Sequence, residues 1–476
     1  MKKSKKLFGS LLCGIAILLF PLPVKAAEVP YQTYTYDKWN NTTPAPNGYL
    51  PTRSISGAEL GCGDFKNASD LFYCEARGEL YIVDSGNARI VILDKELHVL
   101  DEWTALKLSD GGEYTFSNPQ GIYVSEDGTA YIAEMGNQEV VVCGRDGYVL
   151  QVLGAPQSFL LPDNFNYQPH KVVVDKSGRI YVLSKGVYQG IAYLEPDGTF
   201  IKFFGANNVE MTLQRRIRKI WKDILSDKAA ATMQAFNPIE YGNLFLGEDG
   251  YIYATAAGSE SGAALVTRLN PLGIDTLPAI KGRGRNTSVY ADIAVDANGI
   301  MTFLDTTYGT IYQMDENGSL MFAFGGLGNQ VGLFKKPVSL VAVEDRLYIM
   351  DADKNTITEF ELTQFGEMVQ TAINLYNDGL YEESIEPWRE VTQRNSNYLL
   401  AYTGLGKAYY QLGRYEDAMY YYRLANDRSN YSDAFKEASL GKIRDSFPII
   451  VLVMVLLIAA AVSFRIYKKR RKGAPA

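Results

Sequence analysis

Carboxylates recur at one kind of position in this chain, directly after a short apolar run that carries an aromatic residue. Glu134, Asp305 and Asp351 each stand at such a place. Two interpretations are open: the carboxylates could serve acid–base catalysis, or they could accept hydrogen bonds from nearby backbone N–H groups in a turn. Because the feature is repeated along the chain, the turn interpretation is favoured. We therefore expect no catalytic residue among them, and Glu134, Asp305 and Asp351 remain the three to test.

The apolar runs belong to a longer unit that occurs six times between Leu71 and Asp351. Each unit holds four strand-sized segments, and its turn residue recurs at a spacing of about 50 residues, which indicates a repeat architecture. A sheet of four short strands cannot bury both faces alone, so the units must pack radially and close into a ring. The sequence therefore predicts an all-β, six-bladed propeller over residues 27–362.

Two segments depart from this regular pattern. The interval between the third and fourth units is longer, and apolar residues recur there at helical spacing, which predicts a helical insertion at about residues 210–236. The sixth unit lacks one strand, and the alternating segment Tyr31–Trp39 has strong β character. We expect this segment to supply the missing strand and so to remove the exposed edge of the ring.

One unit resembles a known repeat closely. It reads Tyr81-Ile82-Val83-Asp84-Ser85-Gly86-Asn87-Ala88-Arg89-Ile90, which resembles the NHL repeat, a family of six-bladed propellers. The second unit keeps Glu134, Gly136 and Asn137, whereas the third to fifth units depart further from the pattern. The resemblance implies that a ligand binds at the face where the loops between blades and between second and third strands emerge.

That face would bring aromatic, amide, acidic and basic side chains together. Aromatic rings stack on the apolar face of a sugar, while amides and guanidinium groups bond hydroxyls or carboxylates. We therefore expect a glycan or a peptide as ligand and no cofactor or metal. The interpretation that tyrosine is simply a preferred strand residue stays open for part of the set. The expected ligand-binding residues are Asn87, Glu134, Asn137, Tyr167, His170, Tyr188, Arg283, Arg285 and Tyr308.

After Leu362 the period changes. Gly379 and Gly413 stand 34 residues apart within similar segments, and 34 residues is the length of a tetratricopeptide repeat. The segment from Tyr402 to Ala425 resembles that family closely, and the preceding copy resembles it less. The resemblance implies an all-α module over residues 363–430 that binds protein or peptide, although a rigid stalk is an equal alternative. A capping helix is expected at residues 431–446.

Both ends carry signals for export and anchoring. Lysines, an apolar core and a small-x-small site predict a signal peptide over residues 1–26. Residues 447–467 are apolar enough to span a bilayer, and a basic tail follows at residues 468–476. We expect a single-pass cell-membrane protein with its N-terminal domains extracellular and its C-terminus cytoplasmic.

Composition excludes some partners. The net charge of −7 and the export signal argue against nucleic acid. Cys62, Cys74 and Cys143 do not make a disulfide framework; Cys62 and Cys74 either pair or are buried as small hydrophobes.

Two function hypotheses remain. The first is a surface-anchored binding or scaffold protein, whose propeller captures a ligand and whose helical module contacts a membrane partner. The NHL-plus-tetratricopeptide layout looks like proteins that accompany carbohydrate uptake, which implies a sugar ABC transporter as partner. The alternative is a metal-dependent propeller enzyme, lactonase-like or lyase-like. That resemblance implies a metal site, for which the two histidines, His98 and His170, are too few to give three imidazole ligands.

Overall fold

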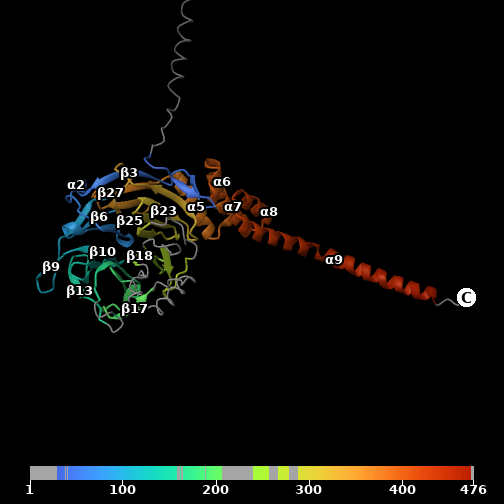
Figure 1. Ribbon diagram of the computed structural model, residues 1–476, viewed down its shortest axis with the longest axis horizontal. Coiled ribbons are helices and arrows are strands. Elements are labelled where there is room, and N and C mark those ends of the chain that lie inside the picture. The colour runs from blue at the N-terminus through green and yellow to red at the C-terminus, as the bar shows by residue number, and fades with distance from the viewer. Residues whose placement is uncertain are drawn as a thin grey trace, which may run out of the picture.

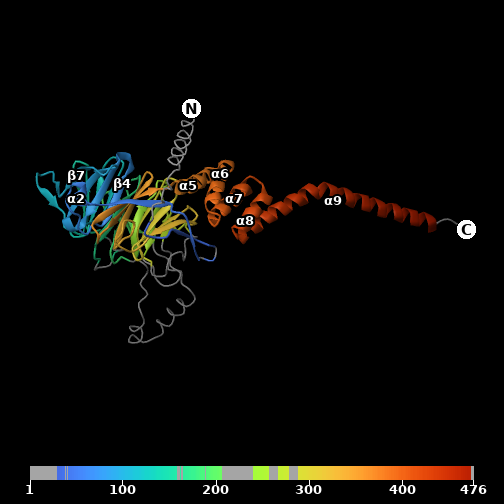
Figure 2. The ribbon, with the colours of Figure 1, turned by 90° about the horizontal axis from the view of Figure 1, so that it is seen from above.

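The computed structural model describes residues 29–37, 39, 41–157, 161, 165–187, 189–205, 240–256, 266–277 and 288–472. Six antiparallel sheets are arranged around a common axis, and a helical region extends from one side of the ring (Figures 1 and 2). The first strand of each sheet contacts the first strands of both neighbouring sheets, so these six strands surround the axis. The predicted six-bladed β-propeller followed by helices is therefore confirmed.

The blades follow one another in chain order, and each is written from the axis outward. Blade one has β4 Asp70–Cys74, β5 Glu79–Asp84, β6 Arg89–Asp94 and β7 Val99–Trp103, and blade two has β10 Pro119–Val124, β11 Ala130–Glu134, β12 Glu139–Cys143 and β13 Val149–Leu153. Blade three has β14 Pro169–Val174, β15 Ile180–Ser184, β16 Ile191–Leu194 and β17 Phe200–Phe204, and the described part of blade four has β18 Tyr241–Leu246, β19 Ile252–Ala256 and β20 Val266–Leu269. Blade five has β21 Tyr290–Val295, β22 Met301–Asp305, β23 Thr310–Met314 and β24 Leu320–Gly325, and blade six has β25 Pro337–Val343, β26 Arg346–Asp351, β27 Thr356–Leu362 and β3 Tyr49–Ser56.

Short elements lie between the blades and between the strands of blade one. A hairpin of β8 Ala105–Lys107 and β9 Glu113–Thr115 lies in the chain between blades one and two, α2 Gly57–Leu60 follows β3, and the 3-10 turns Glu75–Arg77 and Ser85–Asn87 lie in blade one. Strands such as β5 are buried at every position, because neighbouring blades cover both faces of the sheet.

The strand that completes blade six is not the expected one. β3 pairs with β27 from Tyr49↔Leu362 to Ser56↔Thr356 and joins the two ends of the propeller. The predicted segment Tyr31–Trp39 instead forms β1 Tyr34–Tyr36, which pairs with β2 Thr42–Pro44 and with β24 at the outer edge of blade five. The prediction that an N-terminal strand closes the ring is confirmed, but the strand is β3 and not the segment Tyr31–Trp39.

The helical region packs directly on the ring. Two helix pairs, α5 Gln364–Asn377 with α6 Tyr381–Arg394 and α7 Leu399–Gln411 with α8 Tyr415–Leu424, follow β27. The Tyr398 hydroxyl donates to the Met321 carbonyl at 2.9 Å, and the rings of Phe322, Phe365 and Tyr398 contact one another. Propeller and helices therefore share one continuous hydrophobic core.

The last helix is longer than expected. The predicted cap at residues 431–446 and the predicted span at residues 447–467 lie in one helix, α9 Arg428–Lys472. Its start packs on α8, with Ala434 fully buried, and its apolar window has a mean hydropathy of 2.9 and is exposed (Figure 2). Among the described residues, α9 is the one helix long and apolar enough to cross a membrane.

Some predictions fall on residues that are not described. The signal peptide at residues 1–26, the insertion at about residues 210–236 and the last residues of the basic tail lie outside the described part of the chain. Cys62, Cys74 and Cys143 are described, and all three are buried free thiols. The pairing of Cys62 with Cys74 is therefore wrong, and the alternative of buried small side chains is correct.

Candidate functional site: the central channel and its two mouths

Six equivalent residues meet at the axis. In every blade, one residue of the innermost strand pairs with the last-but-one residue of the second strand. In five blades a register shift immediately precedes this residue, so a bulged residue separates it from the start of the strand. We call these six residues the axial ring; they are Asp70, Gly121, Lys171, Asn243, Asp292 and Ser339.

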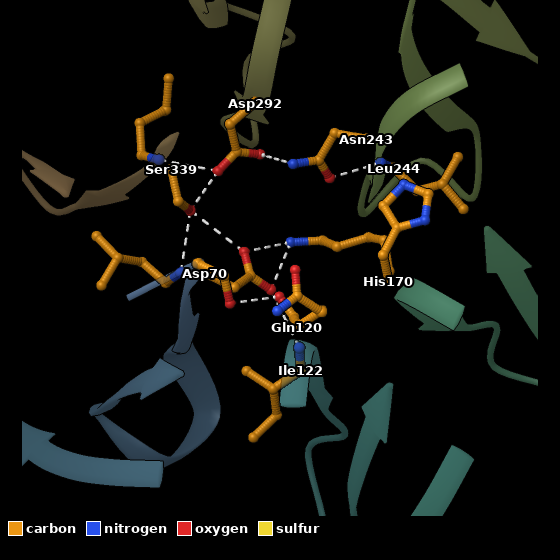
Figure 3. A network of polar contacts seen from close by, with 12 residues as sticks. Asp70, Gln120, Ile122, His170, Asn243, Leu244, Asp292 and Ser339 are labelled. Carbon is orange, nitrogen blue, oxygen red and sulfur yellow. Dashed lines mark hydrogen bonds and ion pairs between the residues drawn. The ribbon is translucent and has the colours of Figure 1, made fainter. Parts of the chain in front are cut away.

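The side chains of five axial-ring residues form one hydrogen-bonded network, in which Ser339 Oγ, 3.2 Å from an Asp70 carboxylate oxygen, links the Asp70–Lys171 pair to Asp292 (Figure 3). Lys171 Nζ donates to both carboxylate oxygens of Asp70, at 2.6 and 2.8 Å. Ser339 Oγ donates to Asp292, and Asn243 Nδ2 donates to the other Asp292 oxygen at 2.8 Å. Asp70 also accepts from the backbone N–H of Ile122 in blade two. These bonds connect the innermost strands of the blades around the axis.

Glycine at position 121 allows Lys171 to reach Asp70. Blade two lies between the blades that carry these two residues, and a Cβ built on Gly121 would lie 2.5 Å from the His170 carbonyl oxygen and 3.1 Å from Lys171 Cα. A side chain there would push blades two and three apart.

Burial sets the protonation of the ring. Desolvation lowers the pKa of Lys171, but the charges of Asp70 and Asp292 outweigh it, and the pKa ends above its ordinary value. Desolvation raises the pKa of Asp292 to about 6, although Lys171 opposes the shift. The Lys171 ammonium is thus held charged and paired with Asp70.

A first cavity of about 430 Å³ lies above the axial ring. Its walls come from residues just before the innermost strands and just after the second strands, so it lies at the face from which the ligand was expected to be bound. We call it the mouth cavity. Its lining is made of amides, hydroxyls, small residues and lysines: Asn67, Ala68, Ser69, Asp70, Ser85, Gly86, Asn118, Gln120, His170, Lys171, Lys185, Gly242, Asn243, Ala291, Lys336, Val338 and Ala352.

A second cavity of about 940 Å³ lies at the other end of the channel, and we call it the hairpin cavity. Side chains alternate along a strand, so residues two positions after the axial ring share its orientation. These form an apolar ring: Phe72, Tyr123, Val173, Phe245, Ala294 and Val341. Helix α5 supplies part of the wall through Glu367, Gln370, Thr371 and Asn374.

Of the nine residues predicted to bind ligand, His170 lines the mouth cavity. Its Nε2 lies 3.3 Å from the Gly242 carbonyl oxygen, and its buried Nδ1 has no hydrogen-bond partner in the described part of the protein. Burial, with a contribution from Lys185, lowers the pKa of His170 to about 4, so the ring is neutral near pH 7. Tyr188, Arg283 and Arg285 lie outside the described residues.

The other predicted binding residues that the structure describes line neither cavity. Asn87 and Asn137 are exposed; the Asn87 amide donates to Asp84 at the start of its own loop, and the Asn137 amide donates to the Tyr114 hydroxyl in β9. Tyr167 is buried, and its hydroxyl has no partner among the described residues. Tyr308 is partly buried and donates its backbone N–H to Asp305.

The repeated carboxylates hold loops in place. Glu134 accepts from the backbone N–H groups of Ser117, Asn118 and Gly136, at 2.6 to 3.1 Å. Desolvation raises the pKa of Glu134, while these N–H groups lower it. Asp351 accepts four backbone N–H groups in the same way. These contacts agree with the turn interpretation.

Asp305 follows the same pattern, with the Ser288 hydroxyl at 2.6 Å and two backbone N–H groups as donors. Within the described ranges, His, Cys, Asp and Glu residues do not form a group of three that could hold a metal ion.

Sequence reasoning missed the axial ring and the lysines of the mouth cavity. The signal was nonetheless present, because each repeat carries one residue followed directly by three apolar or aromatic residues, as in Asp292-Ile293-Ala294-Val295. Aligning the repeats at this position would have placed the six residues in register. Lys185 and Lys336 carry no comparable signal, since they lie in loops of different length.

No protein-family model matches the sequence, and no curated protein matches it. Solved structures resemble it in fold. Virginiamycin B lyase from Staphylococcus aureus is 9% identical over 66% of this chain and 100% of that chain, with a TM-score of 0.41. An auxiliary nutrient binding protein from Bacteroides ovatus is 13% identical over 71% of this chain and 78% of that chain, with a TM-score of 0.40. A protein of unknown function from Bacteroides caccae is 11% identical over 65% of this chain and 98% of that chain, with a TM-score of 0.36.

Proposed function

We propose that this protein is a membrane-anchored, extracellular binding protein whose propeller takes a glycan or peptide ligand in the mouth cavity. The observation that carries the proposal is the cavity itself: about 430 Å³ of space, lined mainly by polar groups, among them Asp70, Lys171 and Asn243 of the axial ring. Small-molecule sites are commonly clefts of about 300–1,000 Å³ in which a few polar groups fix the ligand.

The anchor and the partner belong to the same proposal. The exposed apolar part of α9 supports a single membrane span, and the signals at the two ends of the sequence support an extracellular propeller. The resemblance of the helical region to tetratricopeptide repeats supports a protein partner in the membrane, for which we propose a sugar ABC transporter.

The metal-dependent enzyme has less support. Glu134, Asp305 and Asp351 each accept several hydrogen bonds that hold the neighbouring loops, and all three are fully buried. A carboxylate in that role is not free to bind a metal ion without releasing the loop.

The test is a glycan and peptide array probed with the full-length protein in detergent. Ala291 lines the mouth cavity, and Ala291→Phe would fill part of it whatever the charge of the ligand. Ala297→Phe is the matched control, because Ala297 lines the hairpin cavity. We expect Ala291→Phe to abolish array binding and Ala297→Phe to preserve it; the reverse result, or binding indifferent to both, would refute the mouth cavity as the site.

A further inference from the structure

We propose that the ligand of the mouth cavity is a short acidic oligosaccharide whose anionic groups bind Lys185 and Lys336. The inference rests on the proposed function, since it names the ligand class for the same cavity.

The unpaired charge of the cavity is positive. Its lining holds three lysines and one aspartate, and the aspartate, Asp70, is neutralised by Lys171. Lys185 and Lys336 are exposed and form no ion pair with any described residue. The chain as a whole carries a net charge of −7, so the local excess of positive charge in the cavity is opposite in sign to the net charge of the protein. A cleft lined by one sign of charge attracts ligands of the opposite sign.

The two lysines lie on opposite sides of the mouth. Lys185 follows β15 in blade three, and Lys336 precedes β25 in blade six. The contacts of the six innermost strands follow the chain order around the axis, which sets blades three and six across the ring from each other. A ligand that engages both ammonium groups must carry at least two separated anionic groups, as an oligomer of acidic sugars does.

The rest of the lining suits hydroxyl groups. Asn118 and Gln120 contribute amides, Ser69 and Ser85 contribute hydroxyls, and His170 contributes an uncharged imidazole. No Phe, Tyr or Trp side chain of the described residues lines this cavity, so stacking of such a ring on an apolar sugar face does not contribute there. Polar and charged contacts therefore favour an acidic saccharide over a neutral one, and over a peptide with apolar side chains.

The experiment is isothermal titration of the full-length protein in detergent with three probes: a galacturonic acid trisaccharide, maltotriose and triglutamate. We expect the galacturonate trisaccharide to bind, and its affinity to fall about tenfold in Lys185→Gln and in Lys336→Gln, because each variant removes one charge-assisted contact. Raising the salt concentration should weaken binding as well. Lys176→Gln is the matched control: it removes one exposed lysine from the turn between β14 and β15, outside the mouth-cavity lining.

When a probe binds, three results would overturn the inference. They are maltotriose binding as tightly as the acidic trisaccharide, triglutamate binding more tightly, and Lys176→Gln weakening binding as much as the two cavity variants. Binding of maltotriose that is lost in Ala291→Phe would refute the acidic ligand and leave the proposed function intact. Failure of all three probes would refute this inference, and the array would then decide the proposed function separately.

Discussion

Lys171 and Asp70 meet at the axis with about 9% and 2% of their side chains exposed. The desolvation of two buried charges is costly, so a pair of this kind adds little stability compared with apolar residues of the same size. Removing one partner is a different matter, because the other charge is left buried without compensation. In this protein the ammonium also faces a second carboxylate, Asp292.

We predict that Lys171→Met destabilises the propeller by about 3–5 kcal/mol, since it leaves Asp70 and Asp292 without their cation. Thermal melting followed by circular dichroism would measure the change. The double variant Asp70→Asn with Lys171→Met should recover part of the loss, because it removes the uncompensated charge. If Lys171→Met has the same melting temperature as the wild type, the Lys171–Asp70 pair does not hold the axial ring together.

A second residue-scale prediction concerns His170. The folded protein holds its pKa at about 4, below the ordinary value, so the unfolded chain takes up a proton first as the pH falls. The contribution of His170 to the free energy of unfolding is therefore fully present above about pH 6.5, and it is lost as the pH falls towards 4. Asp292 acts in the opposite direction, because its raised pKa of about 6 favours the folded state as the pH falls through that value.

His170→Gln removes the histidine contribution and leaves that of Asp292. We therefore expect the melting temperature of the variant to fall less than that of the wild type between pH 7.5 and pH 4.5. Equal pH dependence in the two proteins would mean that His170 is not held neutral by its surroundings.

At the scale of elements, repeat number and strand order could be predicted from the sequence because every blade repeats the same alternation and the same turn. The closing strand could not, since β3 contains Pro51, which is unfavourable within a strand. Pro51 pairs with Phe360 next to a register shift, where its missing N–H is tolerated. The segment Tyr31–Trp39 has the better strand pattern and forms a hairpin on blade five instead.

The candidate site was harder to predict, for a physical reason. Equivalent positions of a repeat can be aligned, but a cavity depends on which loop side chains turn inwards. The face was chosen by resemblance, and of the nine residues predicted for it, His170 alone among those described lines the cavity. Asn87 and Asn137, which belong to the most recognisable repeats, bond Asp84 and Tyr114, neither of which lines the cavity.

The helical module depends on glycines where helices cross. A Cβ built on Gly406 would lie 2.5 Å from Cδ1 of Tyr422. We predict that Gly406→Leu unfolds α7 and α8, since no such side chain fits between them. Limited proteolysis would detect the change.

Gly441→Leu is the matched control, because nothing lies within 4 Å of the equivalent position in α9. Similar proteolysis of both variants would contradict the close packing.

At the scale of the whole molecule, the proposed orientation across a membrane can be tested by cysteine labelling. Cys62, Cys74 and Cys143 are buried, so the native background should be low. We expect a membrane-impermeant maleimide to label Leu150→Cys on intact cells, because Leu150 is exposed on the propeller. Lys468→Cys should be labelled after permeabilisation. Labelling of Lys468→Cys on intact cells would place the C-terminus outside.

Ligand binding at the mouth cavity can be tested by hydrogen–deuterium exchange with and without the galacturonic acid trisaccharide, because this measurement locates the ligand on the ring. We predict slower exchange in segments that border the mouth cavity, at residues 66–70, 117–121, 184–187 and 334–338. Exchange in the hairpins at residues 75–78 and 296–299, which border the hairpin cavity, should be unchanged. Slower exchange confined to those hairpins, or no change in either group of segments, would contradict binding at the mouth cavity.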